Sequence, residues 1–246
     1  MSWTNTPRLL ARKCRSSIAR RGFWGSLQWV FDNRSFYLSK YCSPLSRLSI
    51  WCLAQVERLR FGTDTAAVVQ LADLDIRSQN RRHGQQYQPT RHRQFQKALR
   101  ALGIKDHREW TFIDLGSGKG KVLLAAAAFP FAKIVGVEFS AELNAIAREN
   151  IAKYLDRLRC QQIELIYADA AEWPFPNGKM IVYLYNPFDS EVLARVLDNL
   201  ETSLRVHQQE AYVIYVTPTW KEIFDGSALL RTVRSNGSIS IYRTRI

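Results

Sequence analysis

The sequence predicts an α/β fold, a doubly wound and mostly parallel seven-stranded sheet with an antiparallel C-terminal hairpin strand, plus a helical N-terminal extension. Two observations predict it. From residue 111 onward, short β-branched and aromatic segments alternate with segments of helical periodicity, which is typical of βα units. Near the C-terminus, two further strand-like segments flank Asn236-Gly237, a pair that favours a tight turn between antiparallel strands.

The elements are expected in a regular order. Strands are predicted at 111–115, 133–138, 162–167, 180–185 and 211–217, followed by a hairpin of 229–234 and 238–243 closed by a primed turn at Asn236-Gly237. Helices are predicted at 91–102 and 119–128, then after Ser140 and after Asp189, each of which is placed to cap a helix. Their apolar stripes comprise Phe95, Ala98, Leu99 and Leu102; Leu143, Ala147, Ile151 and Tyr154; and Leu193, Val196, Leu197, Leu200 and Leu204.

Charge divides the chain into three expected parts: a basic helical extension (1–60), a connector and lid segment (61–105), and a ligand-binding domain (106–246). Residues 1–60 hold 11 Lys and Arg against two acids. The eight bases of 76–105 face no acid, whereas 106–246 is close to neutral. The net charge of +13 therefore lies N-terminal to the domain and indicates an anionic partner, either RNA, an acidic protein or a peripheral membrane surface, or else a solvated extension with no partner.

Several classes of protein do not fit the composition. The four cysteines have no CxxC spacing and the four histidines complete no zinc pattern, so no metal site is expected and a reducing compartment fits best. No apolar run reaches the 18 or so residues of a membrane span. The Arg-rich start lacks the apolar core of a secretory signal, although a transit peptide has a similar composition. We therefore expect a cytoplasmic protein.

The glycine-rich turn is the most informative segment. Asp114 lies near the end of the first strand, and Gly116, Ser117, Gly118 and Gly120 follow it before a helix. Glycines let a ligand approach the backbone, and the start of a helix offers unpaired amides, so the segment predicts a nucleotide-like cofactor. A P-loop requires GxxxxGK[ST], which the chain lacks, and the spacing fits the GxGxxG nicotinamide fingerprint poorly.

Three further polar segments follow predicted strands. Glu138 ends the second strand, Asp169-Ala170 follows the third, and Asn186-Pro187-Phe188 follows the fourth. Ligands of open α/β sheets bind at the carboxyl ends of strands, so these residues are expected near the glycine turn. Each also has a structural interpretation, because Asp, Asn and Pro favour turns and an acid at a strand end is often only solvated.

With these motifs in this order, residues 106–246 resemble the class I S-adenosylmethionine-dependent methyltransferases. The matching segments are Asp-Leu-Gly-Ser-Gly-Lys-Gly, Val-Gly-Val-Glu, Asp169-Ala170 and Asn186-Pro187-Phe188. Upstream, 60–65 and 87–90 resemble a bacterial subfamily of undefined substrate, in which Tyr87 and Thr90 would belong to a lid. The resemblance implies that Glu138 binds the cofactor's ribose and that Asp169 meets its adenine.

The resemblance also implies a role for Asn186, Pro187 and Phe188 in orienting the methyl acceptor. Amino-group methyltransferases carry Asn-Pro-Pro-Phe or Asn-Pro-Pro-Tyr at this point, and the present chain has one proline fewer. A nitrogen acceptor is therefore favoured over oxygen, with protein lysine, an RNA base and a small amine all open. Two other functions remain: a nicotinamide-dependent oxidoreductase, and a non-catalytic protein of the same fold that binds RNA or membrane through its basic N-terminal region.

Overall fold

The structure is a computed structural model that describes Thr63, Thr65 and residues 92–245. The predicted extension at 1–60 lies outside the described residues. So does most of the predicted connector and lid segment at 61–105, including Tyr87 and Thr90. The expected fold class is confirmed for the described part.

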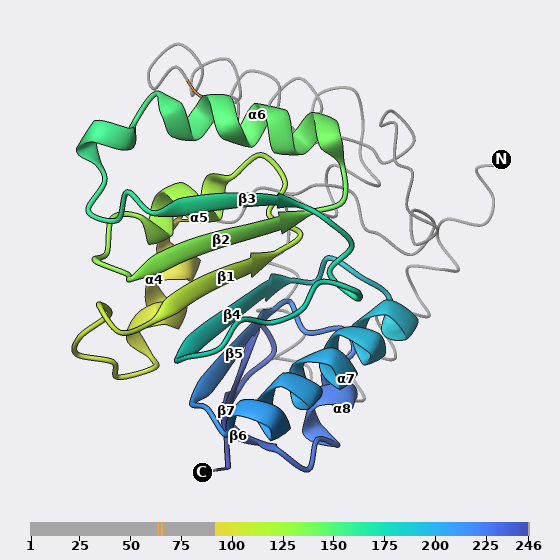
Figure 1. The fold of residues 1–246 in the computed structure, drawn as a ribbon. Helices are drawn as coiled ribbons and strands as arrows, with labels where there is room; N and C mark the ends of the chain where they lie inside the picture. The colour runs from red at the N-terminus through yellow and green to blue at the C-terminus, as the bar shows by residue number, and fades with distance from the viewer. Residues whose placement is uncertain (1–62, 64, 66–91, 246) are drawn as a thin grey trace, which may run out of the picture.

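A seven-stranded sheet forms the centre of the molecule, in the order β3-β2-β1-β4-β5-β7-β6 (Figure 1). Strands β1 to β5 pair in parallel, and β7 runs antiparallel to both of its neighbours. The strands are β1 (Thr111–Leu115), β2 (Lys133–Glu138), β3 (Ile163–Tyr167), β4 (Met180–Tyr185), β5 (Ala211–Val216), β6 (Leu230–Ser235) and β7 (Ile239–Thr244).

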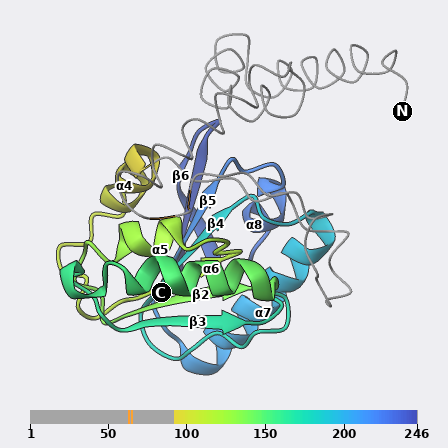
Figure 2. The ribbon, with the colours of Figure 1, turned by 90° about the horizontal axis from the view of Figure 1, so that it is seen from above.

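Helices cover both faces of the sheet (Figures 1 and 2). One apolar core lies under α4 (His92–Arg100) and α5 (Lys121–Ala126), and α6 (Ala141–Ala152) lies on the same side. The second core lies under α7 (Ser190–His207) and α8 (Lys221–Asp225). A short 3₁₀ helix, η3 (Leu155–Arg157), follows α6. Because strand side chains alternate between faces, each central strand contributes to both cores, and β5 is buried along its whole length.

The predicted helix stripes are the buried faces of the helices. The stripe residues of α4 and α7 are all buried, as are Leu143, Ala147 and Ile151 on α6. Ser140 caps α6 by accepting a hydrogen bond from the Leu143 N–H. Gly136 on β2 lets α5 pack closely, because a Cβ there would lie 2.6 Å from Cδ1 of Leu123. The core therefore follows the apolar periodicity of the sequence.

Two predicted details are wrong. The helix expected at 119–128 is shorter, because Gly118 and Gly120 have left-handed backbone angles and α5 begins only at Lys121. The hairpin forms, but its turn is not primed, since neither Asn236 nor Gly237 has a positive φ. Instead, Oδ1 of Asn236 accepts hydrogen bonds from the N–H groups of Ser238 and Ile239, and this side chain closes the loop.

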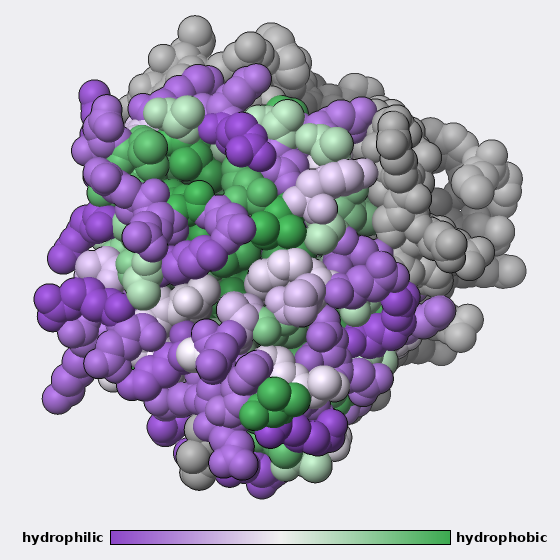
Figure 3. Space-filling model, viewed as in Figure 1, coloured by the Kyte–Doolittle hydropathy of each residue, from purple (hydrophilic) through white to green (hydrophobic). Residues whose placement is uncertain are grey.

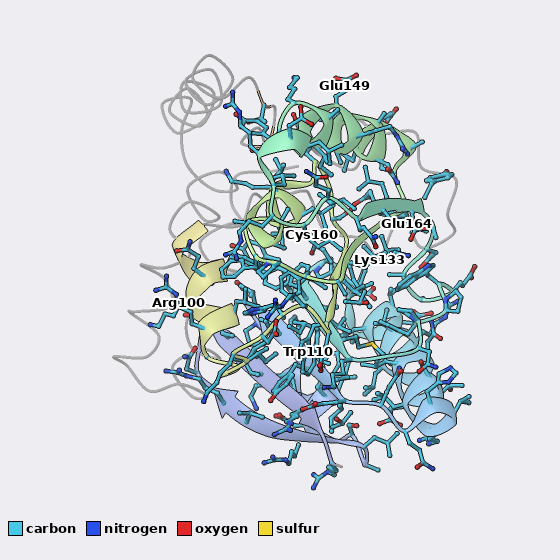
Figure 4. The ribbon with its side chains drawn as sticks, turned by 60° about the vertical axis from the view of Figure 1, so that its left-hand side comes forward. Arg100, Trp110, Lys133, Glu149, Cys160 and Glu164 are labelled. Atoms are coloured by element: carbon cyan, nitrogen blue, oxygen red, sulfur yellow. The ribbon has the colours of Figure 1, made fainter. Side chains whose placement is uncertain are left out.

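The surface toward the viewer in Figure 3 is mainly hydrophilic, with a hydrophobic area at the level of α6 and β3. Leu155, just after α6, is 37% exposed. At the β3 edge of the sheet, Lys133 on β2 and Glu164 on β3 form an ion pair, and Figure 4 labels both. Among the described residues, none of the helices has the length and apolar character needed to cross a bilayer.

Asp189 is expected to stabilise α7 as its N-terminal cap. Its Oδ1 accepts hydrogen bonds from the N–H groups of Glu191 and Val192, at 3.1 and 3.2 Å. Asp189→Ala should lower the free energy of unfolding by about 1 kcal/mol, measured by urea titration. Asp198→Ala is the matched control, because this exposed acid of the same helix makes no side-chain hydrogen bond to a described residue. Equal losses in the two variants would contradict the capping role.

Candidate cofactor and acceptor site

The glycine turn connects β1 to α5 through three left-handed residues. Gly116, Gly118 and Gly120 have φ values of 75°, 53° and 78°, a region that residues with a Cβ rarely adopt. The N–H groups of Gly116 and Ser117 both donate to the carbonyl of Val137 on the adjacent strand, at 2.9 and 3.1 Å. The turn is therefore fixed against the carboxyl end of β2.

Gly116 also lies directly against the segment that follows β4. A Cβ on Gly116 would lie 2.8 Å from Cβ of Pro187, closer than real Cβ contacts come. Gly120 is similarly restricted by Ala147 on α6, at 3.1 Å. The first and fourth predicted motifs thus lie against each other through a glycine and a proline.

Glu138 is buried at the end of β2 and links two loops. Its Oε2 accepts a hydrogen bond from the Gly118 N–H at 2.8 Å, and its Oε1 accepts one from the Ser140 N–H at 2.9 Å. Burial raises the pKa of this carboxyl to about 7, although the backbone N–H groups of Ser140, Gly118 and Phe139 favour the charged form. With three backbone N–H groups on its four lone pairs, the carboxylate retains a lone pair for a ligand hydroxyl.

Asp114 lies on the same face of the sheet as Glu138. It pairs in register with Gly136, two residues before Glu138, and its side chain is 3% exposed. Burial, and next the negative charge of Glu138, raise the pKa of Asp114 well above its ordinary value. Two buried acids so close together resist carrying two charges at once, so ionisation of Glu138 favours a neutral Asp114.

A small recess opens at the carboxyl ends of β1, β2, β3 and β4. Four of the predicted residues line it, namely Gly116, Asp169, Ala170 and Phe188. The other lining residues are Val137, Phe139, Ala168 and Val192. The lining is mainly apolar with one acid, which is typical of a small-molecule site.

Asp169 has one side-chain oxygen committed to its own loop. Its Oδ1 accepts a hydrogen bond from the Ala171 N–H at 3.0 Å, and the N–H groups of Glu172 and Trp173 bond to its carbonyl. The structural interpretation of Asp169 as a turn former is therefore correct. Its place in the lining of the recess is compatible with a second role.

Asn186 begins the segment that follows β4 and has a φ of 44°. Asparagine tolerates this left-handed conformation better than most residues. Its Oδ1 accepts a hydrogen bond of 2.9 Å from the phenol of Tyr215, which is a fully buried residue of β5. Pro187 contacts the glycine turn and Phe188 lines the recess, so the three residues of the motif lie beside the recess in different ways.

The structure brings the predicted residues together at one edge of the sheet, but not all of them line the recess. The predicted residues that lie at the same strand ends but do not line the recess are Asp114, Ser117, Gly118, Gly120, Glu138, Asn186 and Pro187. Sequence reasoning missed Phe139, Val192 and Tyr215. Only Phe139 had a usable signal, since it directly follows the acid at a strand end. Within the described residues, no three His, Cys, Asp or Glu side chains are grouped to hold a metal.

Comparison with known proteins relates this part of the chain to methyltransferase domains. Residues 112–207 match a family model described as a methyltransferase domain. The release factor glutamine methyltransferase of Caulobacter vibrioides is 33% identical over 104 residues, which cover 42% of this chain and 34% of the relative. The demethylmenaquinone methyltransferase of Bacillus licheniformis is 29% identical over 129 residues, which cover 46% and 50% of the two chains.

A solved structure gives a weaker likeness. The ribosomal protein L11 methylase of Lactobacillus delbrueckii subsp. bulgaricus aligns at a TM-score of 0.47 with 16% identity, over 63% of this chain and 80% of that one. The chain spans a third to a half of the length of the curated relatives above. The matched family model covers the strands that carry all four predicted motifs. Residues 112–207 are therefore similar to a methyltransferase domain, the class that the motifs of the sequence resemble.

Proposed function

We propose that the protein transfers a methyl group from S-adenosylmethionine to a nitrogen acceptor. The observation that carries the proposal is the convergence of Gly116, Asp169, Ala170 and Phe188, from three different strand ends, on one recess. In this proposal the recess holds the adenine, and Glu138 holds the ribose. The turn formed by Asp114, Ser117, Gly118 and Gly120 lies along the rest of the cofactor.

The residues present fit such a ligand. A planar base suits a narrow apolar recess that contains Phe139 and Phe188, and the carboxylate of Asp169 can accept from an exocyclic amino group. Gly116 presents bare backbone to the recess, and Pro187 leaves no room for a Cβ there. Glu138 already accepts three backbone N–H groups, and its remaining lone pair suits a ribose hydroxyl.

When bound, the cofactor supplies a sulfonium methyl group that an unprotonated nucleophile can attack. The chain then needs to contribute mainly orientation, and proximity alone is worth about 7–11 kcal/mol of a barrier. Asn186, Pro187 and Phe188 are assigned to this task, because they directly follow β4 beside the recess, where Pro187 lies against Gly116 and Phe188 lines the recess. The proposal requires no acid, base or metal at the acceptor.

The acceptor is proposed to be a nitrogen of a protein lysine, an RNA base or a small amine. This preference rests on the Asn186-Pro187-Phe188 segment alone, since the two curated relatives are named for different acceptors, a glutamine and demethylmenaquinone. The anionic partner, the cytoplasmic location and the three-part division of the chain at residues 60 and 105 belong to the proposal. The anionic partner and the division depend on the basic composition of the N-terminal region, whereas the location depends on the cysteine pattern.

Calorimetry with S-adenosylhomocysteine on the full chain tests the cofactor site. Asp169→Asn keeps an oxygen for the Ala171 N–H but replaces the other carboxylate oxygen with an amino group, which cannot accept from adenine. We expect binding about tenfold weaker, the value of one charge-assisted hydrogen bond. Glu172→Gln is the matched control, because Glu172 is an exposed acid of the same loop outside the recess.

Absence of binding to the wild-type chain would refute the proposal, and unchanged binding by Asp169→Asn would refute the adenine assignment. A parallel titration with NAD discriminates the oxidoreductase alternative. Labelled methyl transfer from S-adenosylmethionine into cell extract, fractionated into protein, RNA and small molecules, then identifies the acceptor class. Label that enters a carboxylate or hydroxyl group instead of nitrogen would overturn the assignment of Asn186.

A further inference from the structure

The hydrogen bond between Tyr215 and Asn186 connects the acceptor segment to a strand that the cofactor site does not use. Tyr215 lies on β5 with no exposed surface, and its phenol lies 2.9 Å from Oδ1 of Asn186 beyond the end of β4. Asn186 is half-buried, and its side chain makes no other hydrogen bond with the described residues. Tyr215 is thus the side chain that determines how the amide of Asn186 is oriented.

The direction of this hydrogen bond follows from the other partners of the phenol. The N–H of Trp220 points at the phenol oxygen from 3.4 Å, and the backbone of Thr219 also bonds to it. With backbone donors on the oxygen, the phenol proton remains to be donated, and Asn186 is its acceptor. The amide oxygen therefore faces Tyr215, and the amide NH₂ faces away from it.

The environment of Tyr215 keeps its phenol protonated, so that the side chain remains a hydrogen-bond donor. Burial raises the pKa of the phenol, and the negative charge of Glu222 acts in the same direction, so the proton stays in place at neutral pH. Tyr215 also packs against Phe224 of α8, with ring centroids 5.8 Å apart. A rigid donor on a central strand is a suitable support for a residue that must hold one orientation.

We propose that Tyr215 is a positioning residue that fixes the side-chain amide of Asn186 with its oxygen on the phenol and its NH₂ group turned to the acceptor. This inference rests on the proposed methyl transfer for its catalytic consequence, but not for the hydrogen bond itself. It further implies that the acceptor molecule carries a hydrogen-bond-accepting atom, such as a carbonyl oxygen or a ring nitrogen, close to the methylated nitrogen, which an RNA base has and a lysine side chain lacks.

The first experiment reads the bond without cofactor or acceptor. In a full chain labelled with ¹⁵N at asparagine, the side-chain NH₂ signals of Asn186 are identified by their loss in Asn186→Ala. Tyr215→Phe should shift or broaden this pair while leaving the other asparagine signals in place. Tyr242→Phe is the matched control, because it removes a buried phenol that bonds to Asp225 and Lys221 rather than to Asn186. An unchanged Asn186 signal in Tyr215→Phe would overturn the proposal.

A second measurement on the wild-type chain covers the case in which Tyr215→Phe fails to fold. Exchange of the phenol proton for deuterium should shift the side-chain carbonyl carbon of Asn186, and absence of that isotope shift would overturn the proposal.

The catalytic experiment measures labelled methyl transfer from S-adenosylmethionine into cell extract. Tyr215→Phe should slow transfer about tenfold or more with unchanged affinity for S-adenosylhomocysteine, since a misplaced orienting group costs rate and not cofactor binding. In the Asn186→Ala background, Tyr215→Phe should cause no further loss, because Tyr215 acts through Asn186. If the rate losses of the two substitutions were additive instead, the proposal that Tyr215 acts through Asn186 would be overturned. If the wild-type chain transfers no label, the proposed function fails. The NMR experiment still tests whether Tyr215 donates a hydrogen bond to Asn186.

Discussion

Replacing Gly116 with alanine is expected to weaken S-adenosylhomocysteine binding at least tenfold and to lower the free energy of unfolding by about 3 kcal/mol. Two costs add at this position. A left-handed backbone costs a residue with a Cβ about 1–2 kcal/mol. The new methyl group would also meet Cβ of Pro187 at 2.8 Å, and overpacking of this kind costs about 1–3 kcal/mol. To avoid this contact, either Pro187 or the glycine turn must move, and either movement changes the shape of the recess.

Gly103→Ala separates the two costs. Gly103 has a φ of 70°, close to the 75° of Gly116, but a Cβ there would meet nothing within 4 Å. It should therefore lose only about 1–2 kcal/mol of stability and bind S-adenosylhomocysteine as the wild-type chain does. Calorimetry and urea titration of both variants give the comparison. Equal behaviour of the two variants would show that contact between the first and fourth motifs does not shape the recess.

The fold was predictable because its signals are local. All seven strands of the sheet were expected within one residue of their observed ends, since most are short apolar runs bounded by Gly, Pro or polar residues. The helix faces followed from apolar periodicity. The helix α8 was missed, because a five-residue segment is too short to show a period. The turn at Asn236 was predicted wrongly, because asparagine is common both in primed turns and in loops that its own side chain closes by hydrogen bonds.

The sequence predicts only those site residues that could contact a ligand and that also directly follow a parallel strand. Asp169 and Phe188 line the recess, and both follow parallel strands, so topology placed them together. Tyr215 has no such signal. It lies on a β-branched and aromatic strand, and its phenol is distinguished from that of Tyr212 only by the residues that surround it in space. Pro187 was predicted as part of the acceptor segment, but its packing against Gly116, where it leaves no room for a Cβ, was not.

Glu138 is expected to make the protein less stable as the pH rises from about 4.5 to 7. In the unfolded chain its carboxyl ionises near the ordinary glutamate pKa of 4.5, whereas burial raises the pKa in the folded protein to about 7. Between these values the folded state binds more protons than the unfolded state, so stability falls with rising pH. The full difference corresponds to about 3 kcal/mol, present below pH 4.5 and lost above pH 7.

Glu138→Gln isolates this contribution, because an amide keeps the size of the side chain and cannot ionise. The stability of the variant relative to wild type should increase by about 3 kcal/mol from pH 4.5 to pH 8 in urea titrations. Glu109→Gln, at an exposed position, is the control. A buried acid that weakens the fold at neutral pH while accepting two loop amides fits ligand binding better than a purely structural role. A pH-independent difference between the variant and wild type would remove that argument and leave Glu138 as a loop support.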